Sequence, residues 1–470
     1  MGVIAVFDIG KTNVKLLIAD AAGTILEQVS TANPVIVRDG MRRHDLAATE
    51  DWLFDALAEA AGRHDITDFV TSGHGSAGVL VSPGDLDRAE PLCPMLDYEQ
   101  NAPGWLADTY RREGGDFADR GSAIMLGTTH QARQLLWVEH AMPAAFAQGT
   151  AFLGLPQYWA WRLSGITSSE ITCLAAQSDL WNLRAGQPSA IARRHGWDRL
   201  LPPLRRAWEA LGPVRPEVAR RTGLSPQVRV LVGAHDSSVN FYNYQRKGLS
   251  RLAVVSTGTW IVGLSDTVDP AALDPDRGMT TNADVAGALL GGVLCMGGRE
   301  YSAIADQPGG PAPAAADSVC RLVAARVMSV PTFGADDGIF PGSAGRGHVI
   351  GRGALDPVER SSLGVLHLAL LTAECLRALG HKGTIVLDGS YLGDPLYAPL
   401  VAALVPDETV LFNTRANGVA SGAAKLALHG RAGASQRLPG RSRPLDVPGL
   451  TEYARTWRAR AGALSTEARS

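Results

Sequence analysis

The first twenty residues place a short polar turn between two apolar stretches, and this pattern constrains the fold more than any other feature. Residues 4–7 (IAVF) and 16–18 (LLI) are apolar and rich in β-formers, whereas residues 8–13 (DIGKTN) are polar. The sequence therefore predicts a strand, a tight loop and a second strand, with the loop at one end of a sheet. Such sheet ends are where open α/β proteins hold their ligands.

The residues of this turn suit a phosphate and a metal ion. Gly10 lets backbone N–H groups approach a phosphate closely, and Lys11, Thr12 and Asn13 add charge and hydrogen-bond donors. Asp8 is placed to face Mg²⁺, which takes a few carboxylate oxygens together with water and phosphate. A turn of this kind also occurs in ordinary hairpins, so both interpretations stay open on this stretch alone.

Length and composition limit the class of protein. A chain of 470 residues is too long for one core and predicts two or three domains. A net charge of −3 argues against nucleic acid or an anionic membrane as the main partner. Because no apolar run reaches the roughly 18 residues of a membrane span and no signal-peptide pattern opens the chain, we expect a cytoplasmic protein. The five scattered cysteines predict reduced, buried thiols.

Two polar loops in the first half are candidates for sugar contacts. His74 lies in a glycine-rich loop (TSGHGS) after a predicted strand, where it either contacts a ligand or is an ordinary surface residue. Asp97 and Tyr98 lie in the polar stretch LDYEQN, which either holds hydroxyl groups or forms a solvated loop.

Asp236 ends an apolar strand that passes through Gly233 and begins a predicted helix. Aspartate is a favoured helix N-cap, so this residue can have a purely structural role. Alternatively, it is a general base at the mouth of a cleft.

Residues 252–264 (LAVVSTGTWIVGL) repeat the opening pattern of strand, glycine turn and strand. We therefore expect two related domains that face each other across a cleft, each with a phosphate-contacting turn. Further expected elements are helices from Thr49, over 131–140, 155–163, 363–379 and 416–428, a buried strand over 384–387, and an exposed helical excursion over 187–226.

Four motifs together resemble the FGGY carbohydrate kinases of the actin-like ATPase superfold: residues 8–13 (DIGKTN), 233–236 (GAHD), 256–260 (STGTW) and 388–390 (DGS). They follow the order of the family over nearly the whole chain. The resemblance implies an α/β fold of two ribonuclease H-like domains with a central cleft, over residues 1–245 and 246–470. It also implies ATP and Mg²⁺ as cofactors.

The resemblance also implies a role for each matched residue. Asp236 looks like the base that takes the proton of the sugar hydroxyl, and Asp8 looks like the residue that positions Mg²⁺. The remaining roles are the first phosphate loop (Gly10, Lys11, Thr12, Asn13), the second phosphate loop (Thr257, Gly258, Thr259), the adenosine turn (Gly389, Ser390) and the sugar contacts (His74, Asp97, Tyr98). The family includes dimers, but no stretch of this sequence marks an interface.

Two stretches depart from the family pattern. Residues 97–100 (DYEQ) lack the arginine that many pentulose kinases carry in the sugar loop, and residues 296–300 (MGGRE) are unusual. The turn TGTW is similar to that of the fuculose and rhamnulose kinases, which favours a pentulose or a 6-deoxy-hexulose as substrate. A sugar- or nucleotide-sensing regulator without catalysis and an ATPase module without a sugar acceptor are the alternatives.

Overall fold

The computed structural model describes residues 2–467 except residues 309, 336, 352, 416 and 432–437. The chain forms two compact units. Unit 1 comprises Met1–Lys247, Thr281–Leu289 and Asn417–Gln436, and unit 2 comprises Gly248–Thr280, Leu290–Ala416 and Arg437–Ser470. The sequence predicts a single boundary after residue 245. The structure differs in that two later segments, Thr281–Leu289 and Asn417–Gln436, also belong to unit 1.

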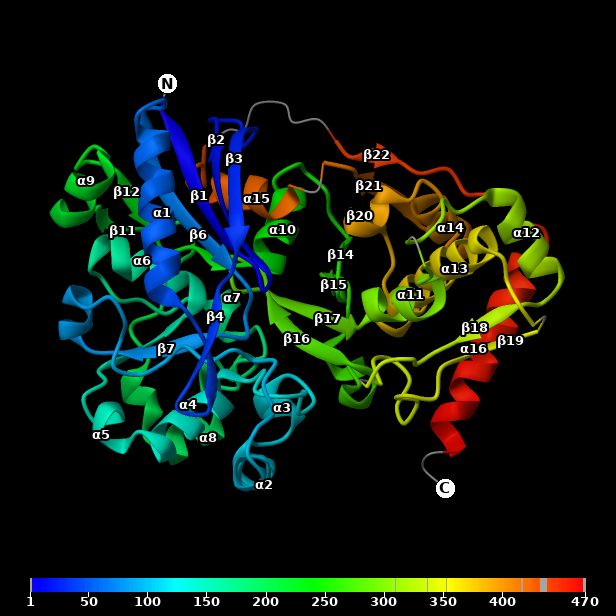
Figure 1. The fold of residues 1–470 in the computed structure, drawn as a ribbon, viewed down its shortest axis with the longest axis horizontal. Helices are drawn as coiled ribbons and strands as arrows, with labels where there is room; N and C mark the ends of the chain where they lie inside the picture. Colours follow the sequence, from blue (N-terminus) through cyan, green and yellow to red (C-terminus); the bar gives the residue numbers. More distant parts are fainter. Residues whose placement is uncertain are drawn as a thin grey trace. The chain divides into compact units, whose positions relative to one another are not determined.

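Unit 1 is built around a mixed sheet (Figure 1). Its strands, in spatial order, are β11 (Ala210–Pro213), β12 (Arg229–Leu231), β6 (Ile66–Gly73), β1 (Val3–Ile9), β2 (Asn13–Ala19) and β3 (Ile25–Ala32), and the short β13 (Ala234–His235) also pairs with β6. The first three strands in the sequence form an antiparallel meander, whereas β6 runs parallel to β1, and β12 and β13 run parallel to β6.

Helices cover both faces of this sheet, which explains why β1 is apolar at almost every position. Phe7 and its neighbours on one face pack with α1 (Leu46–Ala61) and α6 (Leu155–Ser164). Val6 and the other face pack with α10 (Asp236–Gln245) and α15 (Gly418–Leu426). Gly422 of α15 permits this approach, because a Cβ there would lie 1.9 Å from Val239 O.

Smaller elements complete unit 1. They are the hairpins β4 (Val35–Arg38) with β5 (Met41–His44), β7 (Gly78–Val81) with β8 (Ala151–Gly154) and β9 (Trp181–Asn182) with β10 (Gln187–Pro188), and the helices α2 (Gly104–Glu113), α3 (Phe117–Arg120), α4 (Gln131–Ala141), α5 (Pro143–Phe146), α7 (Ile171–Leu174), α8 (Ala190–Arg194) and α9 (Pro216–Thr222). The expected helices over 131–140 and 155–163 are confirmed as α4 and α6.

Two expectations in unit 1 are wrong. Helix α1 begins at Leu46 instead of Thr49, because Asp45 caps it and accepts a hydrogen bond of 3.0 Å from Ala48 N. Residues 187–226 do not form an exposed helical excursion. They contribute β11 to the sheet, and Trp197 is fully buried in a core cluster, because the apolar residues between the arginines face inward.

Unit 2 repeats the strand arrangement of unit 1. Its sheet has the order β17 (Leu289–Cys295), β15 (Ile261–Ser265), β14 (Leu252–Thr257), β20 (Thr384–Gly389), β21 (Thr409–Asn413) and β22 (Gly440–Arg441). The strand β16 (Met279–Ala283), of which only Met279 and Thr280 belong to unit 2, pairs with β17. As in unit 1, consecutive strands at the start (β14, β15, β17) are antiparallel, and the first of them runs parallel to the next long strand, β20. The duplication expected from the two glycine turns is therefore present in the topology.

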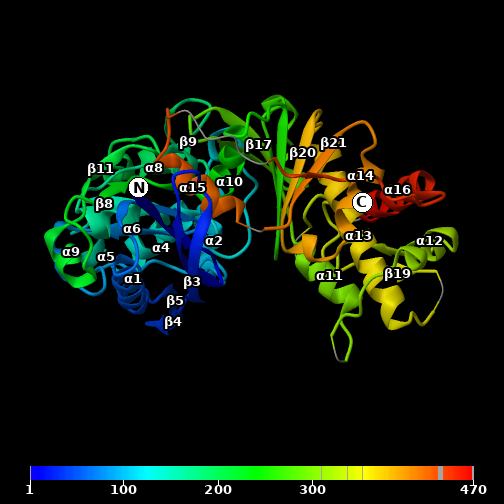
Figure 2. The same cartoon turned by 90° about the horizontal axis from the view of Figure 1, so that it is seen from above.

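The helices of unit 2 are α11 (Gly297–Ala305), α12 (Ala316–Ala324), α13 (Pro357–Ala378), α14 (Tyr397–Leu404) and α16 (Leu450–Glu467), and β18 (Met328–Val330) pairs with β19 (His348–Ile350). Figure 2 shows α13 and α14 on the same face of the sheet. Helix α13 starts six residues before the expected 363, because Asp356 and Glu359 form a reciprocal capping box. In the described part of the chain, every helix is too short or too polar to cross a membrane.

Candidate functional site

Three parallel strand ends meet at one edge of the unit 1 sheet. Asp8 on β1 pairs in register with Ser72 on β6, and Ala234 and His235 on β13 pair with Ser72 and Gly73. Because parallel strands place their carboxyl-end loops at the same edge, the predicted residues Asp8, His74 and Asp236 are brought together there.

Asp8 is held in a partly desolvated position. Burial raises its pKa to about 6, a hydrogen bond of 2.8 Å from Ser72 Oγ opposes this rise, and the Asp236 carboxylate nearby adds to it. Two acidic groups close together favour a cation between them. Oxygen ligands suit Mg²⁺, and among the described residues no group of three or more histidine, cysteine or acidic side chains could hold a metal ion. Two carboxylates supply only part of the ligands of Mg²⁺, so an ion here would take the others from water and phosphate.

Asp236 is the first residue of α10, one position after the N-cap. Its Oδ1 accepts hydrogen bonds from the backbone and hydroxyl of Ser237 and lies 3.2 Å from His235 Nε2. In the described part of the chain, no hydrogen bond reaches the other carboxylate oxygen, and the side chain is 27% exposed. One oxygen therefore fixes the carboxylate while the second can accept a proton.

The loop around Asp97 is packed against the first turn. Lys11 Nζ lies 2.7 Å from Asp97 Oδ1 and 3.5 Å from Glu99 Oε2, and Arg42 donates a hydrogen bond to Asp97 Oδ2. Lys11 Nζ also lies 5.3 Å from the centre of the Tyr98 ring. Asp97 is fully buried, whereas Glu99 and Asn101 of the same stretch are exposed, so only part of this loop is solvated.

The rest of the first turn keeps its donors near the surface. Gly10 N bonds to Asn13 O, and Asn33 holds the turn through hydrogen bonds to the carbonyls of Gly10 and Thr12. The side chains of Thr12 and Asn13 are exposed. The side chain of Lys11, which the sequence predicts to contact phosphate, instead forms ion pairs with Asp97 and Glu99. It therefore does not extend into solvent beside Thr12 and Asn13.

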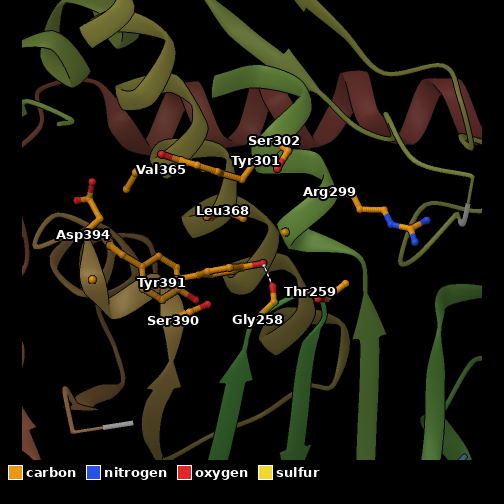
Figure 3. A pocket seen from close by; sticks show the side chains of 13 residues that line it. Gly258, Thr259, Arg299, Tyr301, Ser302, Val365, Leu368, Ser390, Tyr391 and Asp394 are labelled. Carbon is orange, nitrogen blue, oxygen red and sulfur yellow. Dashed lines mark hydrogen bonds between the residues drawn. The ribbon is translucent and has the colours of Figure 1, made fainter. Parts of the chain in front are cut away.

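Unit 2 carries a cavity of about 490 Å³ beside its own glycine turn (Figure 3). Three predicted residues, Gly258, Thr259 and Ser390, line it. The other lining residues are Gly298, Arg299, Tyr301, Ser302, Val365, Leu368, Tyr391, Gly393, Asp394 and Tyr397. A cavity with aromatic and aliphatic walls and a few polar groups suits a flat heterocyclic ligand.

Beside this cavity, residues 389 and 391 lie close to the backbone of residues 257 and 258. Tyr391 Oη donates a hydrogen bond of 2.8 Å to Gly258 O (Figure 3). Gly389 has a φ of +109°, and a Cβ there would lie 2.1 Å from Thr257 O, so only glycine fits. Thr257 Oγ1 donates to Asp388 O, which directs this predicted phosphate contact toward β20.

Several residues of the two sites were not singled out by the sequence. They are His44 and Ser72 in unit 1 and Arg299, Tyr301, Tyr391 and Tyr397 in unit 2. Ser72 and Tyr391 adjoin or lie within recognised motifs, which is a usable signal. His44 and Tyr301 lie in ordinary stretches, and only the folded chain brings them to the sites.

The duplicated sheet, with a glycine turn after the first strand of each unit, defines the actin-like ATPase class of folds. Models of the N-terminal domain of the FGGY family of carbohydrate kinases and of the carbohydrate kinase FGGY C-terminal domain match residues 3–241 and 250–436. The chain belongs to this family.

Individual relatives agree with this assignment. A carbohydrate kinase from Novosphingobium aromaticivorans, whose crystal structure is known, is 30% identical and superimposes with a TM-score of 0.85 over 98% of this chain and 99% of that one. An L-fuculokinase from Haemophilus influenzae is 24% identical over 60% of this chain. A xylulose kinase from Bacillus subtilis is 24% identical over 49% of this chain and 47% of its own length. The match spans 62% of the length of the L-fuculokinase.

Proposed function

We propose that this protein transfers the terminal phosphoryl group of ATP to a hydroxyl group of a small sugar, a ketose such as a pentulose or a 6-deoxy-hexulose. The observation that carries the proposal is the Asp236 carboxylate, which is fixed through one oxygen beside Asp8 while its second oxygen is free of hydrogen bonds among the described residues. A protein that only bound a sugar would not need this base.

Each unit has its own part in the proposed reaction. The acceptor sugar belongs to the strand ends of unit 1, where Asp236 takes the proton of the attacking hydroxyl. The adenosine belongs to the cavity of unit 2, with its tyrosine walls. Backbone and side-chain donors of residues 10, 12 and 13 and of residues 258 and 259 are the proposed phosphate contacts.

Asp8 is the proposed residue for Mg²⁺. When bound, the ion would neutralise charge on the phosphate oxygens. The contribution of the protein is a carboxylate held in place by Ser72, with a pKa of about 6 that leaves it mostly ionised at neutral pH.

The substrate class rests on similarity. Two of the relatives are named for ketoses, L-fuculose and xylulose. The turn over 257–260 (TGTW) resembles that of the fuculose and rhamnulose kinases.

The five cysteines are free thiols, which supports a reducing compartment such as the cytoplasm.

A coupled ADP-release assay with ATP and Mg²⁺ tests the proposal against a panel of ketoses, polyols and aldoses. We expect release with one or two sugars, and release about 10²-fold or more slower with the Asp236→Ala variant, whose affinity for ADP should be unchanged. Release of ADP that does not depend on any sugar would contradict the proposal and favour an ATPase. Binding of sugar and nucleotide without turnover would favour a regulator.

A further inference from the structure

A second histidine, His44, lies beside the predicted sugar contact His74. His44 is the last residue of β5, directly before the Asp45 cap of α1, and it is 4% exposed. The ring centres of His44 and His74 are 5.9 Å apart, and Tyr98 lies 5.5 Å from His74 on another side. All three residues belong to unit 1.

The two histidines present ring nitrogens that the protein does not use. In the described part of the chain, His44 Nε2 and both ring nitrogens of His74 are buried and have no hydrogen-bond partner. Leaving a buried polar atom unpaired costs about 1–3 kcal/mol, and native proteins pair nearly all such atoms. Three unpaired nitrogens on two adjacent rings indicate a binding site in which a ligand supplies the missing hydrogen-bond partners.

The chemistry of this place suits hydroxyl groups. Burial lowers the pKa of His44 to about 3 and that of His74 to about 4, so both rings are neutral at pH 7. A neutral imidazole has one donor and one acceptor, and a hydroxyl group can serve both.

The same place is unsuited to an acid. The nearby cations Lys11 and Arg42 are already paired with Asp97, and Lys11 also with Glu99. The acidic groups Asp8 and Asp236 lie at the adjoining strand ends. A carboxylate on the ligand would meet two like charges, and these two cations are already paired.

The two rings differ in their distance from the proposed base. His74 directly follows Gly73, which pairs in register with His235 beside Asp236, whereas His44 lies on β5, which pairs with β4. His74 therefore adjoins the reacting end of the site, and His44 lies further along it.

We propose that His44 is a second sugar-contacting residue, which together with His74 holds a hydroxyl group beyond the reacting one. The acceptor is accordingly an uncharged sugar with a longer carbon chain than glycerol. This inference rests on the proposed function for its reacting end, but the binding of the sugar can be measured without turnover.

The test uses the full-length protein with two variants. His44→Phe keeps a ring of similar size and removes both nitrogens, whereas His44→Gln retains a donor and an acceptor. D-xylulose, L-fuculose, glycerol and D-gluconate are the probes. Calorimetric titration without nucleotide gives the dissociation constant, and the ADP-release assay gives KM and kcat.

We expect at least one uncharged ketose to bind more tightly than gluconate. His44→Phe should raise its dissociation constant and KM by roughly tenfold, the effect of one lost hydrogen bond to a buried ring, and change kcat by much less. His44→Gln should recover part of this loss. Any turnover of glycerol should be affected less, because a three-carbon acceptor has fewer hydroxyl groups beyond the reacting one.

Three results would overturn the inference. One is unchanged ketose affinity in His44→Phe, and another is an equal loss for glycerol and ketose, which would indicate a purely structural role. The third is a protein that binds none of the uncharged sugars. Tight ketose binding that depends on His44, without any ADP release, would instead refute the proposed function and leave this inference standing.

Discussion

Ser72 donates a hydrogen bond of 2.8 Å to Asp8 Oδ1 across the parallel pair β1 and β6, where the two residues are in register. This bond opposes the effect of burial on the Asp8 carboxyl, whose pKa is nevertheless raised to about 6. A serine at the end of one strand thus partly offsets the effect of burial on an acid at the end of the next.

The pH dependence of activity should respond to this bond. Replacing Ser72 with alanine removes a hydrogen bond to the ionised form, so the pKa of Asp8 rises further. The acidic limb of kcat/KM should therefore move to higher pH, by roughly half a unit to one unit. The pH–rate profile at subsaturating Mg²⁺ measures the shift. Ser76→Ala in the same loop is the control, and an equal profile for both variants would show that Asp8 does not govern this limb.

The turn proposed to contact adenosine should tolerate no side chain at Gly389. Its φ of +109° and the 2.1 Å approach to Thr257 O mean that Gly389→Ala must move backbone, and we expect a loss of about 3 kcal/mol in the free energy of unfolding. Gly393→Ala, four residues later, is a matched control, because its Cβ would meet nothing within 4 Å. Urea unfolding followed by fluorescence measures both. Similar stability of the two variants would contradict this account of the turn.

Nucleotide affinity should depend on the ring of Tyr391 more than on its hydroxyl. The ring lines the cavity, and the hydroxyl bonds to Gly258 O. We expect Tyr391→Ala to weaken ADP binding by tenfold or more, the effect of roughly 1.4 kcal/mol, while Tyr391→Phe has a smaller effect. Calorimetry with ADP measures both, and sugar affinity should stay unchanged. Normal ADP affinity in Tyr391→Ala would place the adenosine elsewhere.

Lys425 is a buried cation that should make stability depend on pH. Its ammonium group bonds to Asn243, and burial lowers its pKa to about 7, with Lys247 and Arg246 acting in the same direction. The unfolded chain therefore binds more protons than the folded one between about pH 7 and the ordinary lysine pKa, so stability should rise with pH over this range.

Replacing Lys425 with methionine should abolish this rise and increase the free energy of unfolding at pH 7, by about 1 kcal/mol or more. Unfolding curves at pH 7 and pH 9 for the two proteins provide the comparison. Lys382→Met, which alters an exposed lysine, is the control. A variant that is less stable than the parent at both pH values would show that the hydrogen bonds to Asn243 outweigh the cost of burying the charge.

Local sequence was enough to predict the strand ends that carry the site. The apolar runs before Asp8, Asp236 and Thr257 form β1, the pair β12 and β13, and β14, because a strand buried on both faces must be apolar throughout. The repeated glycine turns also predicted the duplicated topology, which the pairing of β14 with β15 and β20 confirms.

Tertiary contacts determine what the sequence did not predict. Lys11 looked like a phosphate contact, but the folded chain places two carboxylates beside it from a loop nearly ninety residues later. No motif in the sequence around His44 pointed to a site, because its proposed role depends on the ring of His74, which only the folded chain brings beside it. The return of α15 to unit 1 depends on the close approach of Gly422 to α10.

The central claim is that Asp236 serves the transfer of phosphate to a sugar. The most direct measurement is phosphorus NMR of the protein with ATP, Mg²⁺ and the ketose that binds most tightly. We expect a sugar phosphate that appears in equal amount with ADP, and a rate about 10²-fold or more lower in Asp236→Ala. Inorganic phosphate in place of a sugar phosphate, or normal product formation by Asp236→Ala, would contradict it.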